Sequence, residues 1–221
     1  LDALEASLGI FQRLGDRRSE LLTLSNLAHL QRRLSRPEVA LELSDRAHAL
    51  AVELEDSRSE GRILSNRAAT YLNLGDFEKA SVDLLHALAL AQEVDDQRGR
   101  LSALSNLGNC AYHLGEFDAA RAHWQASLDL EDEQMDQRLR AWLLARVAHL
   151  DARRGKADDR SGVERVEEMF GSAHALLEGR GDLLSEARLL SLQGEARLWQ
   201  GRPREALDAL AASLQRWESQ D

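Results

Sequence analysis

The chain has 221 residues, of which 43% are hydrophobic, so it is long enough and apolar enough to bury a sizeable core. Its net charge of −10 opposes phosphate backbones, and no block of Lys and Arg offsets that repulsion, which argues against nucleic-acid binding. No apolar run approaches the roughly 20 residues of a membrane-spanning helix, and a single cysteine, Cys110, suits a reducing cytoplasm. We therefore expect a folded cytoplasmic protein that binds neither nucleic acid nor a membrane.

The first segment, from Leu4 to Asp16, reads LEASLGIFQRLGD and matches the second half of a unit that recurs along the chain. Its Ser7 and Ile10 occupy the same positions as Ala47 and Leu50 of the next unit. We predict an orphan helix over 1–14. Because the chain starts in mid-repeat and with a residue other than Met, we expect it to be a fragment of a longer protein.

A step of 40 residues organises the rest of the chain. The triplet LSN stands at 24–26, 64–66 and 104–106, and an Asp precedes each apolar helical pattern. We predict that these Asp residues cap helices by accepting free backbone N–H groups, and that they open five repeats over 16–54, 56–94, 96–134, 136–180 and 182–219. The Asp column consists of Asp16, Asp56, Asp96, Asp136 and, after a step of 46, Asp182.

Two further columns predict that each repeat is a hairpin of two helices. Small residues at Ala28, Ala68, Gly108, Ala148 and Gly194 would allow two helices to approach closely. The turn column, expected to adopt a left-handed conformation at its glycines, is Ser35, Gly75, Gly115, Gly155 and Gly201. Pro37 and Pro203 suit the first position of the following helix. The segment KADDRSG, 156–162, holds the six extra residues of the fourth repeat and is expected to enlarge its turn loop.

Helix-favouring Ala, Leu and Arg dominate the composition, so the pattern predicts an all-α fold. The columns resemble the tetratricopeptide repeat family, in its variety of roughly 40 residues per repeat. The resemblance is carried by NLGNCAYHLGEFDAA at 106–120 and by NRAATYLNLGDFEKA at 66–80. The first repeat departs from the pattern in its turn, the fourth at Arg146, and the fifth at Leu192 and Pro203. This resemblance implies a right-handed α-solenoid, a superhelix of helical hairpins.

The resemblance also implies protein or peptide recognition in a groove lined by the first helix of each hairpin. Six arginines against one glutamate among the groove positions suggest a partner segment that is acidic. The groove positions named as the candidate binding site are Asn26, His29, Arg33, Asn66, Asn73, Asn106, Asn109, Tyr112, His113, Trp142, Arg146, His149, Arg153, Arg188 and Trp199.

Two structural alternatives stand beside this site. Asn26, Asn66 and Asn106 could tie adjacent hairpins together without touching a ligand, and Trp142 could belong to the core. The two-carboxylate clamp by which some family members hold chaperone C-termini is not expected, because Ser65 and Ala69 stand where its Lys and Asn would be.

Neither an enzyme nor a cofactor or metal site is expected. The seven histidines form no HExxH motif and no pair four residues apart, and Cys110 has no second Cys beside it. Cys110 lies where a thiol is usually a small buried hydrophobe, and its use as a nucleophile with His113 is the weaker reading.

The favoured interpretation is therefore an interaction module, scaffolding or regulatory, of a larger bacterial signalling or transcription regulator. The bacterial origin is suggested by a composition rich in Arg and Ala and poor in Lys. Two alternatives remain. One is a domain that senses a small-molecule effector, and the other is a module for self-association.

Overall fold

All regular structure in the described part of the chain is α-helical. The computed structural model describes residues 1–130, 135–155 and 159–219. The predicted all-α fold, built from helical hairpins, is confirmed. The helices are α1 (Asp2–Leu14), α2 (Arg17–Arg33), α3 (Pro37–Glu53), α4 (Ser57–Leu74), α5 (Phe77–Glu93), α6 (Gln97–His113), α7 (Phe117–Leu128), α8 (Gln137–Arg154), α9 (Arg160–Leu177), α10 (Leu183–Trp199) and α11 (Pro203–Glu218).

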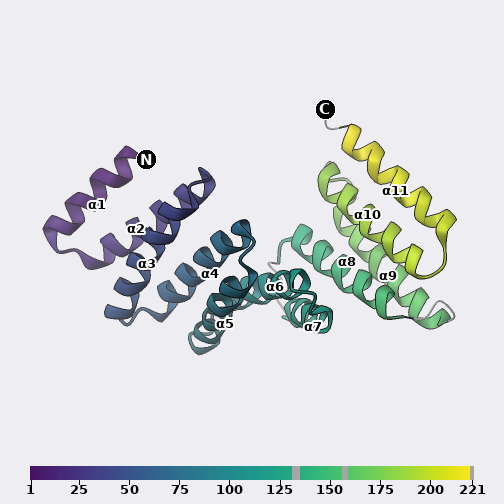
Figure 1. Cartoon of the computed structure of the whole chain (residues 1–221), viewed down its shortest axis with the longest axis horizontal. Coiled ribbons are helices and arrows are strands. Elements are labelled where there is room, and N and C mark those ends of the chain that lie inside the picture. The colour runs from purple at the N-terminus through teal and green to yellow at the C-terminus, as the bar shows by residue number, and fades with distance from the viewer. Residues whose placement is uncertain (131–134, 156–158, 220–221) are drawn as a thin grey trace. The chain divides into compact units, whose positions relative to one another are not determined.

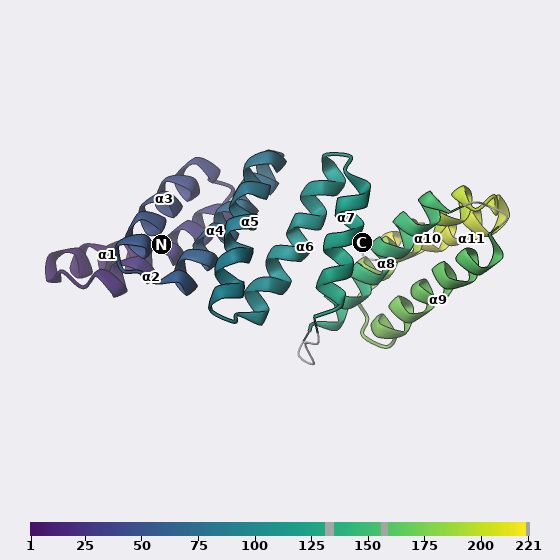
Figure 2. The same cartoon turned by 90° about the horizontal axis from the view of Figure 1, so that it is seen from below.

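Two compact units divide the chain, Leu1–Ala120 and Arg121–Asp221. In the first, helices α1 to α6 pack in chain order, each against the next (Figures 1 and 2). In the second, α8 pairs with α9, α10 pairs with α11, and α10 also packs on α8. The repeat boundaries and the single solenoid over 1–221 stay predictions. Among the helices described, none combines the length and the apolar character needed to cross a bilayer.

The Asp column caps the first helix of every repeat, as predicted. Each carboxylate accepts a hydrogen bond from a backbone N–H two or three residues further on. The donor–acceptor distances lie between 2.8 and 3.2 Å, and Asp136 accepts two such bonds. The bond from the Ser59 backbone is the main cause that lowers the pKa of Asp56 below its usual 3.8. Two caps were not predicted. Asp76 opens α5 and Asp159 opens α9 in the same way.

The turn column behaves as expected except at Gly155. Gly75, Gly115 and Gly201 have φ values of +76°, +80° and +72°, and Ser35 adopts the same left-handed region at +57°. Gly155 instead has φ −67° and ψ 158°, so the left-handed conformation predicted for it is wrong. The Gly155 N–H still donates to the carbonyl oxygen of Asp151, at 2.9 Å, and the chain then leaves α8 in an extended conformation that residues of any type can adopt.

The segment 156–162 is not a loop throughout. Residues 156–158 lie outside the described residues, whereas Arg160, Ser161 and Gly162 form the first turn of α9, which Asp159 caps. Three of the seven residues expected in the enlarged loop therefore belong to a helix. Pro37 and Pro203 do open α3 and α11, as predicted.

Small residues bring the helices of each hairpin close together. Ala68 and Ala148 are fully buried, and Ala28 is 4% exposed. At Gly194 of α10 even a methyl group would be too large, because a Cβ would lie 2.7 Å from Leu210 Cγ and 3.2 Å from the carbonyl oxygen of Ala206. Contact between α10 and α11 therefore depends on a residue without a side chain.

We predict opposite effects for alanine at two helical glycines of the second unit. Gly171→Ala, where a Cβ meets no atom within 4 Å, should raise the free energy of unfolding by about 0.5–1 kcal/mol through helix propensity. Gly194→Ala should lower it by about 1 kcal/mol, because overpacking against α11 outweighs that gain. Chemical denaturation of both variants tests this, and a stabilised Gly194→Ala would contradict the close approach.

The cap at Asp56 can be tested by a matched pair. Asp56→Ala should destabilise the chain by about 1 kcal/mol at neutral pH, whereas Asp56→Asn, which can accept the same hydrogen bond, should cost much less. Because the folded pKa of Asp56 is lowered, its stabilising effect is present above pH 3.8 and lost as the pH falls further. Urea titration at neutral and acidic pH measures both effects, and equal stability of the two variants at neutral pH would count against the cap.

Candidate functional site

A groove of about 580 Å³ runs across α2, α4 and α6 in the first unit. Small polar residues dominate the part contributed by these helices, and the C-terminal part of α5 adds Ala87 and Ala91. Short side chains leave the helix surfaces accessible. The lining residues include Ser25, Asn26, His29, Gly61, Ser65, Asn66, Gly99 and Ser102.

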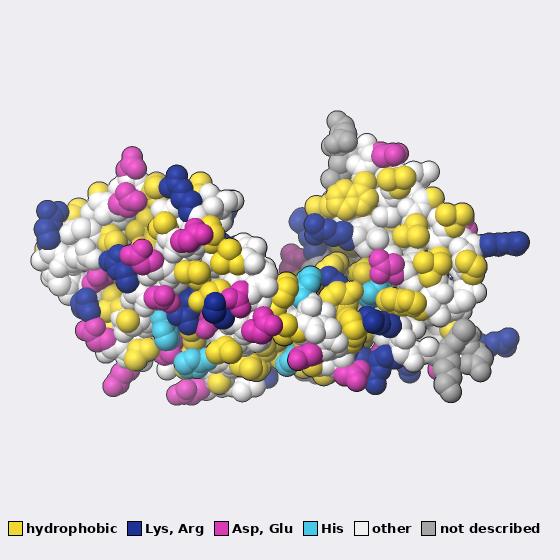
Figure 3. All heavy atoms as spheres, viewed as in Figure 1, with side chains coloured by type: hydrophobic (Ala, Val, Ile, Leu, Met, Phe, Trp, Pro, Cys, Tyr) yellow, Lys and Arg dark blue, Asp and Glu magenta, His cyan; other side chains and the backbone are white. Residues whose placement is uncertain are grey.

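The groove is basic although the chain is acidic. Arg58, Arg62 and Arg98 line it, against a single carboxylate, Asp96, which accepts a backbone hydrogen bond as a helix cap. Partial burial, and then the positive charges of Arg32 and Arg33, lower the pKa of His29 below its usual 6.5. Acidic and basic side chains are interspersed over the visible face of this unit (Figure 3). The groove lining itself carries three arginines against one carboxylate.

Only some of the predicted binding residues of the first unit line this groove. Asn26, His29 and Asn66 do so. Arg33 and Asn73 are exposed but lie outside its lining.

The predicted residues of α6 lie outside the groove lining as well. Asn106, Asn109 and Tyr112 are half-buried. The His113 ring stacks on Phe77 with 4.5 Å between centroids. His113 is nevertheless exposed, and all four side chains keep accessible surface.

In the second unit, Arg146 of α8 lies between two tryptophans. Its guanidinium carbon is 4.2 Å from the centre of the Trp142 ring and 5.3 Å from that of Trp124. Cation–π contacts of this kind attract a cation to a ring face and restrict the orientation of the side chain. Trp124 of α7 is fully buried, whereas Trp142 is half-buried, so Trp142 belongs neither wholly to the core nor wholly to the surface.

A second aromatic contact joins α8 to α10. The Trp199 ring, 40% exposed, lies 4.6 Å from the His149 ring, and the Arg153 guanidinium lies 5.8 Å from its centre. His149 is itself fully buried, and its Nε2 is 2.8 Å from a carboxylate oxygen of Glu195. His149 therefore packs beneath Trp199 and Glu195, and it does not offer the exposed surface predicted for it.

Burial determines the protonation of His149. Desolvation, the largest effect, lowers its pKa below 6.5, although the hydrogen bond to Glu195 acts in the opposite direction. Nearby Arg146 and Arg153 lower it further. The imidazole is therefore neutral at physiological pH.

A smaller pocket, of about 260 Å³, lies between α8, α9 and α10. Trp142 and Arg188, both predicted binding residues, line it together with Arg138. Its remaining walls are largely apolar, from Leu139, Leu177 and Leu189 among others. The pocket thus offers an apolar floor beside two guanidinium groups.

The sequence reading missed the arginines at the start of the groove helices. Arg58, Arg98 and Arg138 each follow a capping Asp by two residues, and Arg18 stands at the same position of the first repeat. The step of 40 residues would have identified this column. The sequence does not predict a role for Trp124, because this residue lies on the second helix of its repeat and the groove positions were assigned to the first helices.

Cys110 is 1% exposed, as expected for a packed thiol, and burial raises its pKa to about 11. A thiol with that pKa stays protonated at neutral pH, which makes it a poor nucleophile.

A family model described as tetratricopeptide repeat matches residues 19–93 and 59–133, which together span more than half of the chain. The chain belongs to the tetratricopeptide repeat family. No curated protein sequence matches it.

Solved structures of other tetratricopeptide-type proteins share the fold at low identity. The crystal structure of BtubC (BKLC) from P. vanneervenii has a TM-score of 0.77 and 19% identity, with 99% of this chain and 90% of that chain covered. A putative kinesin light chain from Podosopora anserina, with nearly identical TPR-like repeats, has a TM-score of 0.70 and 16% identity over 91% and 96%. The apo form of RapI has a TM-score of 0.59 and 12% identity over 97% and 92%.

The buried His149 makes a testable contribution to the pH dependence of stability. Below its usual pKa of 6.5 the unfolded chain binds a proton that the folded chain does not, so the free energy of unfolding should fall as the pH drops through this value. His149→Gln keeps a donor for Glu195 but cannot titrate, and should show a shallower fall between about pH 7 and pH 5. Parallel denaturation curves across this range test the assignment, which identical slopes would refute.

Proposed function

We propose that this chain is a non-catalytic interaction module that binds an extended, acidic segment of a protein partner. Tetratricopeptide repeats generally mediate protein–protein interaction, and this chain carries such repeats over more than half of its length. The basic groove of the first unit is the observation that supports the finer proposal.

The chemistry of the groove suits an extended peptide. Asn side chains supply both a donor and an acceptor, so Asn26 and Asn66 can hold a peptide backbone without demanding a particular sequence. Gly61 and Gly99 have no side chains, so the helix backbone is accessible at these two places in the groove. Arg58, Arg62 and Arg98 would then favour a segment that carries carboxylates.

The second unit would add anchoring positions of a different type. Trp and Arg are enriched among the residues that dominate binding energies at protein interfaces. Arg146 is held in place by Trp142 and Trp124, which reduces the entropy that it would lose on binding. The pocket of about 260 Å³ beside Trp142 and Arg188 would then receive one side chain of the partner.

A small-molecule effector stays an alternative. Ligand pockets usually measure about 300–1,000 Å³, a range that includes the groove of the first unit, at about 580 Å³, but not the pocket of the second unit, at about 260 Å³. Self-association stays an alternative, because α11 exposes Leu207, Leu214 and Trp217 along one side. A cytoplasmic bacterial regulator as the parent protein is part of the proposal, and the Arg-rich, Lys-poor composition supports its bacterial origin.

The proposal predicts which peptides the chain selects from a displayed library of short random sequences. We expect enrichment of peptides rich in Asp and Glu, and weaker binding as salt rises, because exposed charges are screened. Arg58→Glu with Arg62→Glu should reduce the affinity for a selected peptide by at least about tenfold, which corresponds to about 1.4 kcal/mol.

Arg46→Glu is the matched control, because Arg46 is exposed on α3 and lies outside the groove lining. The affinity of this variant for the selected peptide should stay near that of the parent, apart from a small long-range effect of the changed charge. Selected peptides without acidic enrichment would overturn the acidic-partner proposal. Unchanged binding by the double variant would show that the groove is not the binding surface.

A further inference from the structure

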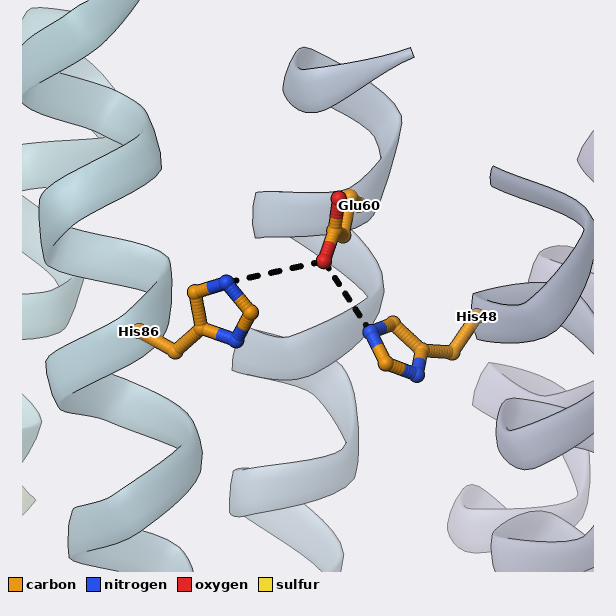
Figure 4. A group of neighbouring side chains, drawn as sticks. All are labelled: His48, Glu60 and His86. Carbon is orange, nitrogen blue, oxygen red and sulfur yellow. Dashed lines mark hydrogen bonds and ion pairs between the residues drawn. The ribbon is translucent and has the colours of Figure 1, made fainter. Parts of the chain in front are cut away.

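Two histidines and one glutamate from three successive helices meet in the first unit. His48 of α3, Glu60 of α4 and His86 of α5 place one ligand atom each within 4.8 Å of one another. Figure 4 shows the two imidazole rings approaching the same carboxylate oxygen from opposite sides. The Nε2 atom of His48 is 3.1 Å from Glu60 Oε1, and that of His86 is 3.6 Å from it. From this convergence we propose a binding site for a divalent transition metal, with Zn²⁺ as the best fit.

The distances agree with the geometry of a zinc site. Zn–N and Zn–O bonds of about 2.0–2.2 Å in a tetrahedron separate neighbouring ligand atoms by roughly 3.3 Å. The two separations from Glu60 Oε1, 3.1 and 3.6 Å, lie on either side of this value, and all three ligand atoms lie within 4.8 Å of one another. Two imidazoles and a carboxylate are also a ligand set that zinc takes in proteins, with water in the fourth position.

The surroundings hold the ligands in a partly enclosed position. The Glu60 side chain is 13% exposed and that of His48 is 26% exposed, whereas His86 is 52% exposed. A metal would therefore sit near the surface, with an open side for water. The three residues are not among those that line the basic groove, so this site does not depend on the proposed peptide binding.

A neighbouring ion-pair network fixes the same three helices. Arg67 of α4 bonds both carboxylate oxygens of Asp83 on α5, at 2.7 Å each, and reaches Asp45 of α3 at 2.6 Å. Asp45 and Asp83 lie one helical turn before the two histidines. Because these contacts already tie the helices together, the histidines need little rearrangement to receive an ion.

The combination of His48, Glu60 and His86 does not follow from the repeat pattern. The equivalent positions at the preceding junction are Leu8, Glu20 and Arg46, and those at the following junction are Leu88, Arg100 and Ala126. The last junction has His174 and Glu186 but Ala212. Among the junctions of this chain, the second alone supplies all three ligands.

Zinc titration of the full chain, freed of any histidine tag, tests the site. We expect one Zn²⁺ per chain by calorimetry, and a higher melting temperature with Zn²⁺ that a chelator reverses, because an ion that binds only the folded state stabilises it. Replacing residues that merely orient a ligand weakens zinc about 10–100-fold, so His48→Ala and His86→Ala should each cost at least tenfold. Co²⁺ should give visible absorption bands in the parent that both variants lose.

His29→Ala removes a histidine of the groove and should leave zinc affinity unchanged. Because His86 is half-exposed, its variant should keep the helical circular dichroism of the parent, so that lost binding is not a failure to fold. Absence of zinc binding at micromolar concentrations by the parent would overturn the proposal. Binding that survives in both His48→Ala and His86→Ala would do so as well. Peptide selection by the basic groove should be the same for the His86 variant and the parent, which separates this site from the proposed function.

Discussion

Close approach of neighbouring helices is the constraint on which the rest of the structure depends. Ala or Gly recurs where the helices of a hairpin meet, and these positions are almost completely buried. A larger residue at one such position would push two helices apart, and every column that faces the groove would shift with them. Gly194 shows the limit, since its place between Leu210 and the Ala206 backbone accepts no side chain. The spacing of the candidate binding residues is therefore set by residues buried in the core.

The repeat made the fold predictable, because each column has one local physical role. An Asp before an apolar helical pattern caps that helix, and a Gly after the pattern ends it, whatever the neighbouring repeats contain. Gly155 departs from this pattern, and it stands in the repeat that has six extra residues after its first helix. The repeat columns also do not predict how side chains from several helices are arranged around one another. His48 and His86 are 38 residues apart, and only the packing of α3, α4 and α5 reveals that both reach Glu60.

The candidate binding surface was predictable as a set of helix faces but not in its detail. Asn26, His29 and Asn66 do line the groove of the first unit. The sequence could not show that His149 is buried, since this depends on Trp199 covering it from the next hairpin. Nor could it show that Arg146 lies between two rings, one of which comes from the helix before it. A column assigns a residue to a face, whereas the neighbouring helix decides how much of that residue remains accessible.

The consecutive packing of the helices also bears on how such a chain can change in evolution. In the first unit the principal contacts join each helix to the one before it and the one after it. A core built in this way has no centre that all elements share. A whole hairpin can then be duplicated or lost while the remaining hairpins keep their own cores. The number of hairpins can therefore vary by duplication within the gene, and single substitutions in a duplicated copy can give one junction between hairpins a set of side chains that the other junctions lack.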